Sequence, residues 1–192
     1  MKLLFRLFSL SFFLFFTCLA HGNEEAQIVF GGDSFKIPFP KEGSIFLPIY
    51  SGMKNTISSD SNLEIYILVP EGNKYKQLYV GTIYPEGRRP EIESIFFHNV
   101  DDLPGDELFI LVSCQILNIS SGGKYYTVYI FSKELDEATG GLKRLTLIEE
   151  KLGQGLEGVV DTDDGGEGKK VHAPYTNAAG VRRILREKGF LK

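Results

Sequence analysis

The sequence predicts a single β-dominated domain, an antiparallel sandwich or partly closed sheet, with one helix at its C-terminal end. Three apolar runs between Ile92 and Phe131 favour strands, because each is short, rich in Ile, Val, Phe and Tyr, and bounded by Asn, Asp, Gly or Ser. Shorter runs of the same kind precede this stretch, and only residues 177–188 carry a convincing apolar stripe at helical spacing. A chain with many short strands and one helix is typical of antiparallel layers.

The first 22 residues have the features of a secretory signal peptide. Lys2 and Arg6 precede an uncharged run rich in Phe and Leu, and Ala20 and Gly22 are small enough for a signal-peptidase site. The run is shorter than the ~20 residues that cross a membrane comfortably, so we expect cleavage, with an uncleaved anchor as the alternative. The prediction is a periplasmic or secreted protein of residues 23–192 without a membrane span.

Charge and cysteine content narrow the class of protein. The chain has a formal net charge of −4, and loss of Lys2 and Arg6 on cleavage makes the mature protein more negative. This argues against nucleic acid as a partner and suits a basic protein partner. Cys114 is the only cysteine that remains after cleavage, so no internal disulfide is expected, and its apolar neighbours predict a buried side chain. The mature length predicts one domain with its own core.

Turn residues separate the strands expected before the central stretch. Pro70 and Gly72 indicate a tight turn, and Pro48 predicts an edge position for the strand that contains it. The expected segments are residues 27–30 and 34–38, as a hairpin or edge pair, and strands at 44–50, 63–69 and 74–84.

Three further segments follow the central stretch. Residues 142–152 alternate as expected for a strand, and residues 169–173 predict a last short strand. Between them, residues 153–168 contain many glycines and acidic residues, which predicts a flexible acidic loop around a short strand at Val159–Val160.

The C-terminal helix has start and stop signals. Thr176 or Asn177 can cap its N-terminus, and Gly189 is suited to the position that ends it. Phe190 and Leu191 are expected to fold back as its apolar partners. The apolar stripe consists of Val181, Ile184 and Leu185, and the outward face carries Arg182, Arg183 and Arg186. Two interpretations stay open, a structural cover over the sheet and a basic docking surface.

Residues 99–108, NVDDLPGDEL, form an acidic turn before a strand. The string resembles the turn D-x-D-G-D-G-x-x-E-L of FG-GAP-type calcium-loop proteins. This resemblance implies a Ca²⁺ site with Asn99, Asp101 and Glu107 as ligands, since Ca²⁺ prefers closely spaced oxygen atoms. Leu103 and Pro104 depart from the pattern. The alternative is a β-turn capped by Asn or Asp side chains, in which Pro104-Gly105 sets the bend.

The stretch from Asn118 to Tyr125, NISSGGKY, is predicted to be a protruding loop between two strands. Small hydroxyl residues, glycines and a tyrosine in such a loop are typical of an adaptable contact surface on a rigid sheet. The residues expected to touch a partner are Ser120, Ser121, Gly122, Gly123, Lys124 and Tyr125.

The acidic turn, the apolar strand after it and the Ser-Gly loop with a tyrosine together resemble the periplasmic inhibitors of invertebrate-type lysozyme. The resemblance implies a β-rich protein that inserts a Ser-Gly-x-Tyr loop into the active-site cleft of the enzyme. Ser121, Gly122 and Tyr125 are the matching residues. Gly123 and Lys124 place one additional residue before Tyr125, and alternation along a strand can turn that side chain to the opposite face of the sheet.

The sequence contains no complete catalytic constellation. Motifs for a nucleophile elbow, a zinc-protease helix, a dithiol pair and a phosphate loop are all missing. The one arrangement that can be imagined pairs His98, held by Asp101 or Asp106, with Ser113 or Ser121.

We therefore expect a non-enzymatic exported binding protein, most specifically an inhibitor or immunity-type partner of a cell-wall-degrading enzyme such as a lysozyme. The alternative is a calcium-stabilised, FG-GAP-like surface module that binds saccharide or protein. A hydrolase with an unrecognised site is a third reading.

Overall fold

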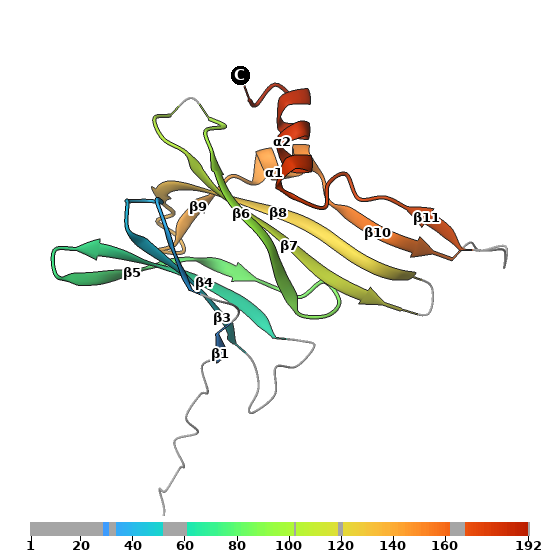
Figure 1. Ribbon diagram of the computed structural model, residues 1–192, viewed down its shortest axis with the longest axis horizontal. Helices are drawn as coiled ribbons and strands as arrows, with labels where there is room; N and C mark the ends of the chain where they lie inside the picture. The colour runs from blue at the N-terminus through green and yellow to red at the C-terminus, as the bar shows by residue number, and fades with distance from the viewer. Residues whose placement is uncertain are drawn as a thin grey trace, which may run out of the picture.

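The protein consists of two antiparallel β-sheets with two helices packed on the larger sheet (Figure 1). The computed structural model describes residues 29–30, 34–51, 61–101, 103–118, 121–161 and 168–191. The predicted signal peptide, residues 1–22, lies outside the described residues. The β-dominated antiparallel fold with a C-terminal helix confirms the predicted fold class.

The smaller sheet is built around strand β3 (Ser44–Ser51), which pairs with β4 (Asn62–Glu71), and β4 pairs with β5 (Lys74–Ile83). On its other side β3 pairs first with β2 (Phe35–Ile37) and then with β1 (Val29–Phe30). The first two strands are therefore edge segments, but they do not form a hairpin with each other. Pro48 is not on an edge strand; it lies between the stretches that pair with β2 and β1, where its missing N–H breaks no described pairing.

The larger sheet has the order β11-β10-β8-β7-β6. Its long middle strand, β8, pairs with β7 along one side, while β10 and the short strand β9 take successive parts of the other side. The bounds are Pro90–His98 for β6, Glu107–Leu117 for β7, Ser121–Leu135 for β8, Leu142–Arg144 for β9, Gly155–Val160 for β10 and Lys169–Val171 for β11.

Alternation along β7 and β8 divides the core into two layers. Leu108, Ile110 and Val112 point toward the smaller sheet, whereas Phe109 and Leu111 point toward the helices. We call these the inner and the outer face of the larger sheet. Strand β7 is buried on both faces over this stretch, which explains why its sequence is a continuous apolar run rather than an alternating one.

Each face has its own set of core side chains. The inner core joins both sheets and includes Phe46, Ile65, Val80 and Phe131. The outer core joins the larger sheet to the helices; its members include Phe96, Val128, Ile130, Leu152, Tyr175, Val181 and Leu185. The molecule is thus a sandwich with a third, helical layer over one outer surface.

The first helix, α1 (Thr146–Leu152), corrects the strand expected at residues 142–152. Only Leu142–Arg144 is a strand, and the chain then turns into a helix. Leu145, Ile148 and Leu152 pack against the outer core, and their spacing of three and four residues fits one face of a helix. The apolar residues of this segment fit both the period of a strand and that of a helix. Packing against the sheet favours the helix.

The second helix, α2 (Ala178–Glu187), confirms the predicted C-terminal helix. The side chain of Asn177 caps it by accepting a hydrogen bond from the backbone N–H of Gly180 at 2.9 Å. Val181, Ile184 and Leu185 are buried as predicted. Gly189 ends the helix with φ 77°, and the N–H of Phe190 returns to the carbonyl of Leu185.

The acidic Gly-rich segment 153–168 is more ordered than predicted, because residues 155–160 form all of β10. Residues 162–167 lie outside the described residues. Within the described part of the chain, no helix is long and apolar enough to cross a membrane.

Candidate binding face at the tip of the larger sheet

The predicted contact loop is shorter than expected. Strand β7 ends at Leu117 and β8 begins at Ser121, so Ser121 to Tyr125 are strand residues and only 118–120 connect the strands. Asn118 and Ser121 close the connection through a backbone hydrogen bond of 2.9 Å. Ser120 lies outside the described residues. The prediction of a loop over residues 118–125 was therefore wrong for residues 121–125.

Strand alternation separates the predicted contact residues onto two faces. Tyr126 and Val128 belong to the outer core, so Gly122 and Lys124 also lie on the outer face. Tyr125 lies on the inner face with Tyr129. The structure thus does not bring Gly122, Lys124 and Tyr125 to one contact surface.

A groove with apolar walls crosses the outer face at the end of the sheet. Gly122 pairs with Leu117 on one side and with Val159 on the other, so the three residues stand in one row across β7, β8 and β10. Leu117 is 57% exposed and Val159 is 40% exposed. Gly122 has no side chain to fill the space between them. The resulting hollow has a volume of about 370 Å³ and is also lined by Asn118, Ser121 and Asp161.

Glycines bring the backbones of β8 and β10 unusually close beside this groove. A Cβ atom on Gly158 would lie 2.1 Å from the carbonyl oxygen of Gly122, and one on Gly123 would lie 2.3 Å from that of Glu157. Gly123 also has φ 148°, which favours glycine. By contrast, a Cβ on Gly122 would meet nothing within 4 Å, so it points into open space.

Lys124 stands in the next row of the outer face and is held by acidic residues. Its Nζ donates to Glu93 Oε1 at 2.8 Å and to Glu91 at 3.5 Å. The Ser113 hydroxyl donates to the same Glu93 oxygen at 2.7 Å. Burial alone would raise the pKa of Glu93, but the hydrogen bonds from Lys124 and Ser113 outweigh it and hold the pKa below its ordinary value.

The row ends at strand β10 and the residues that follow β11. Glu157, opposite Lys124, accepts a hydrogen bond from the backbone N–H of Ala173 at 3.1 Å, and its other oxygen lies 2.9 Å from Nδ1 of His172. The bonds to His172 and to the Ala173 N–H lower the pKa of Glu157. The outer face near the groove is therefore a set of tethered charges beside an apolar hollow.

Tyr125 is a half-buried strand residue on the inner face. It stands between Cys114 of β7 and Leu156 of β10, and burial, followed by the charge of Glu86, raises its pKa. Cys114 is buried, as predicted, and burial raises the pKa of its thiol.

The predicted calcium ligands make hydrogen bonds within their own turn. The Asn99 amide donates to the carbonyls of Leu103 at 2.7 Å and Gly105 at 2.5 Å, and Asp101 accepts from the N–H of Leu103. Glu107 is buried and accepts from the N–H of Val100 at 2.7 Å; burial raises its pKa. These are the bonds of a side-chain-capped turn, the alternative interpretation. Among the described residues no group of three or more His, Cys, Asp or Glu side chains is placed to hold a metal ion.

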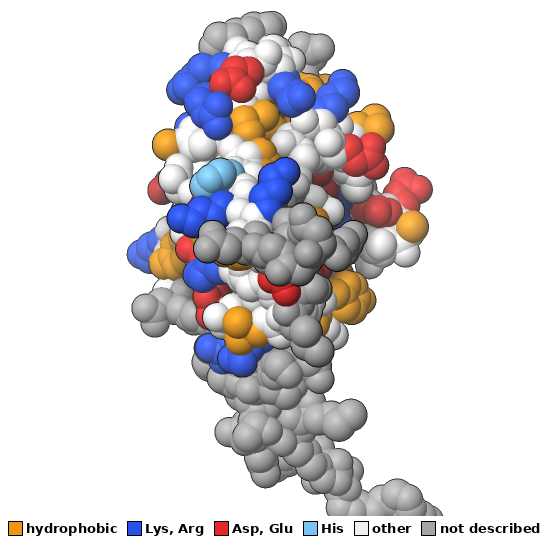
Figure 2. Space-filling model, turned by 90° about the vertical axis from the view of Figure 1, so that its right-hand side faces the viewer, with side chains coloured by type: hydrophobic (Ala, Val, Ile, Leu, Met, Phe, Trp, Pro, Cys, Tyr) orange, Lys and Arg blue, Asp and Glu red, His pale blue; other side chains and the backbone are white. Residues whose placement is uncertain are grey.

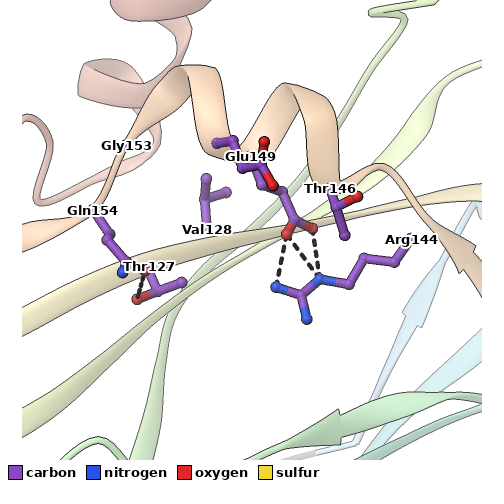
Figure 3. Close-up of a pocket in the computed structure, with 8 residues that line it drawn as sticks. Thr127, Val128, Arg144, Thr146, Glu149, Gly153 and Gln154 are labelled. Carbon is purple, nitrogen blue, oxygen red and sulfur yellow. Dashed lines mark hydrogen bonds and ion pairs between the residues drawn. The ribbon is translucent and has the colours of Figure 1, made fainter.

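A second hollow, of about 390 Å³, lies where β8 loses its neighbour between β9 and β10 (Figure 3). Glu149 of α1 closes this gap in the sheet. Its carboxylate accepts from the backbone N–H of Ile130 at 2.7 Å and is paired with the guanidinium of Arg144 at 2.7 Å. Glu149 is thereby a substitute for a strand partner.

The imagined catalytic pair is not assembled. His98 lies opposite Glu107 at one end of the β6–β7 ladder, whereas Ser113 lies opposite Glu91 toward the other end. The Ser113 hydroxyl is also engaged with Glu93.

Comparison with models of known protein families finds no match, and neither the curated proteins nor the solved structures give a significant match. Sequence reasoning missed Leu117 and Val159, because their relation to Gly122 depends on the pairing of β8 with β10. The available signal was an apolar residue just before the Ser-Gly stretch and another in a Gly-rich segment.

Proposed function

We propose that the protein is an exported, non-enzymatic binding protein that inhibits a cell-wall-degrading enzyme, and that it contacts this enzyme through the outer face at the tip of β7, β8 and β10. The observation that carries the proposal is the groove formed by Leu117, Gly122 and Val159. Exposed apolar side chains on either side of a glycine floor suit the insertion of a protruding group from a partner.

The location of the groove supports the proposal further. Gly122 belongs to the stretch that resembles the Ser-Gly loop of the inhibitors of invertebrate-type lysozyme. Here the stretch is a strand end with a hollow, so the proposal differs from a loop insertion: the partner supplies the protruding group. The sheet is paired on both sides at Gly122, and a preformed surface loses little conformational entropy on binding.

Electrostatics favours a basic enzyme as the partner. The chain has a formal net charge of −4, and Asp161 lines the groove itself. Opposite net charges speed association and select against acidic proteins. We therefore expect a partner with a cationic surface.

The test is an inhibition assay with purified protein from Asn23 onward, which contains every described strand and helix. We expect the protein to slow the lysis of bacterial cell walls by an invertebrate-type lysozyme in a saturable, one-to-one manner. Chicken-type and goose-type lysozymes serve as comparison enzymes. Inhibition of one of those instead would keep the proposal and change the target. Absence of inhibition and of calorimetric binding for all three at micromolar concentrations would contradict it.

A further inference from the structure

Basic residues are concentrated at the C-terminal end of the chain. Residues 169–192 contain seven lysines and arginines and a single acidic residue, Glu187, although the whole chain has more acidic than basic residues. The charge segregation is a separate observation from the groove, although Lys170 is paired with Val159 of the groove wall. A basic segment in an acidic chain predicts a surface that meets a negatively charged partner.

The fold places these charges on the helical layer and the adjacent sheet edge. Arg183, Arg186 and Lys188 are exposed on α2 and at its end. On the edge strand β11, Lys170 pairs with Val159 and therefore lies on the outer face, whereas Lys169 points to the inner face. Figure 2 shows basic side chains over the upper part and along the left side of this view, with a few acidic side chains among them and a further acidic group toward the right edge. The basic residues are therefore spread over one side of the molecule instead of converging on a pocket.

An exposed apolar side chain accompanies this basic surface. Leu147 on α1 is 73% exposed, more than any other large apolar side chain in the described ranges. Lys151 lies one helical turn further on, so it shares a face of α1 with Leu147. The Lys151 ammonium stands 5.3 Å from the ring centre of Phe190, which follows α2. Leu147 thus lies one turn of α1 from the lysine that contacts Phe190, the residue that follows the end of α2.

We propose that this face, comprising Leu147, Lys151, Arg183, Arg186 and Lys188 with Lys170, docks onto the surface of an anionic phospholipid bilayer. Basic side chains near such a surface each contribute to binding, and their contributions add over a broad face. A projecting leucine next to lysine can enter the headgroup region while the ammonium stays outside.

The arrangement favours a bilayer over a small anion or a polyanion chain. A small anion needs convergent donors, whereas these charges lie on different elements. A linear polyanion offers no apolar region that an exposed leucine could contact. The apolar stripe of α2 is buried in the core, so the helix does not insert; contact is limited to the surface and to Leu147.

The experiment is co-sedimentation of the protein from Asn23 onward with vesicles of phosphatidylcholine alone or mixed with phosphatidylglycerol. The test variant is Arg186→Glu with Lys188→Glu, and the matched control is Lys74→Glu with Lys76→Glu, which makes the same charge change at exposed positions of β5. We expect binding to the anionic vesicles only, and weakening by salt. The test variant should lose more than about tenfold in partitioning, and the control should lose much less.

A third variant, Leu147→Ser, keeps the test decisive if the double variant does not fold, because Leu147 is mostly exposed. It should weaken binding to anionic vesicles severalfold at unchanged melting temperature. The proposal would be overturned if the protein bound neutral vesicles equally well, or if it bound no vesicles. It would also be overturned if the Lys74 and Lys76 control lost as much binding as the test variant, or if the protein bound soluble polyphosphate but not vesicles. None of these outcomes depends on inhibition of a hydrolase.

Discussion

Lys124 and Gly122 are predicted contact residues that lie on the outer face, and Lys124 is the charged one of the two. Its ammonium is fixed between Glu93 and Glu91, one row from the groove floor at Gly122. A lysine on four rotatable bonds presents a defined charge only when it is held in this way. The contribution of the tether to stability depends on pH, because Glu93 has a lowered pKa.

Replacement of Glu93 by Gln should reduce the amount by which the free energy of unfolding falls as the pH is lowered. A carboxyl group with a lowered folded-state pKa stabilises the fold above its ordinary pKa, and this stabilisation disappears as the pH falls through the lowered value. Urea unfolding from neutral pH down to about pH 3 measures the effect. Glu91→Gln is the matched control, because Glu91 lies 3.5 Å from Lys124 and is more exposed. Equal curves for both variants would contradict the role of Glu93.

Tyr125 shows the limit of sequence reasoning at this scale. Its size and its Ser-Gly neighbours indicated a contact residue, but β8 begins four residues before it, and alternation places it on the inner face. One residue of register decides which face a side chain occupies. That register is set by pairing with β7 and β10, which no local pattern in residues 118–125 reveals.

At the scale of elements, the close approach of β8 and β10 shapes the binding face. A methyl group at Gly158 would collide with the backbone of Gly122, whereas a methyl group at Gly122 would point into open space. We expect Gly158→Ala to cost about 2 kcal/mol, as for overpacking in a tight site. Gly122→Ala should be neutral or slightly stabilising, because alanine restricts the unfolded chain. Chemical denaturation compares the two, and similar effects would refute the close packing.

The interruption between β9 and β10 gives a second test at this scale. Glu149 satisfies the backbone N–H of Ile130 and pairs with Arg144, which is partly exposed (Figure 3). Glu149→Ala leaves both groups unpaired and should cost about 2 kcal/mol. The neighbouring Glu150 is exposed, so Glu150→Ala should change stability by less than about 0.5 kcal/mol. Thermal unfolding compares the two variants. A Glu149→Ala variant as stable as Glu150→Ala would contradict the role of Glu149 in the sheet.

Most elements could be predicted, and those that could not share a cause. The central strands, the turn at Pro70–Asn73 and α2 with its Asn177 cap each carry local signals that agree with the fold. Helix α1 and strand β10 do not. Apolar residues in 145–152 fit either period, and the glycines of 153–160 indicated a loop until their role as spacers beside β8 was visible.

In the whole molecule, the larger sheet carries two proposed contact surfaces, which adjoin where Val159 pairs with Lys170. Its tip presents the groove of Leu117, Gly122 and Val159, and the helical layer presents the basic face around α2. Figure 1 shows α2 above the sheet and the ends of β7, β8 and β10 away from it. Together the two proposals describe an exported protein that binds a membrane surface through its helical layer and a soluble enzyme through the tip of the larger sheet. The candidate site was predictable only as a stretch of chain, since its two walls and its floor come from three strands and one wall, Val159, is brought to it by long-range pairing.

The most direct measurement is the lysozyme inhibition curve of Gly122→Trp. An indole at this position fills the groove between Leu117 and Val159 without a backbone clash, because the Cβ direction is open. Gln77→Trp places the same side chain at an exposed position of β5 and is the matched control. We expect Gly122→Trp to melt like the wild-type protein and to lose at least about tenfold in inhibitory potency, the scale of an anchor contact, while Gln77→Trp inhibits normally. A folded Gly122→Trp variant that inhibits as well as the wild type would contradict the assignment of this face.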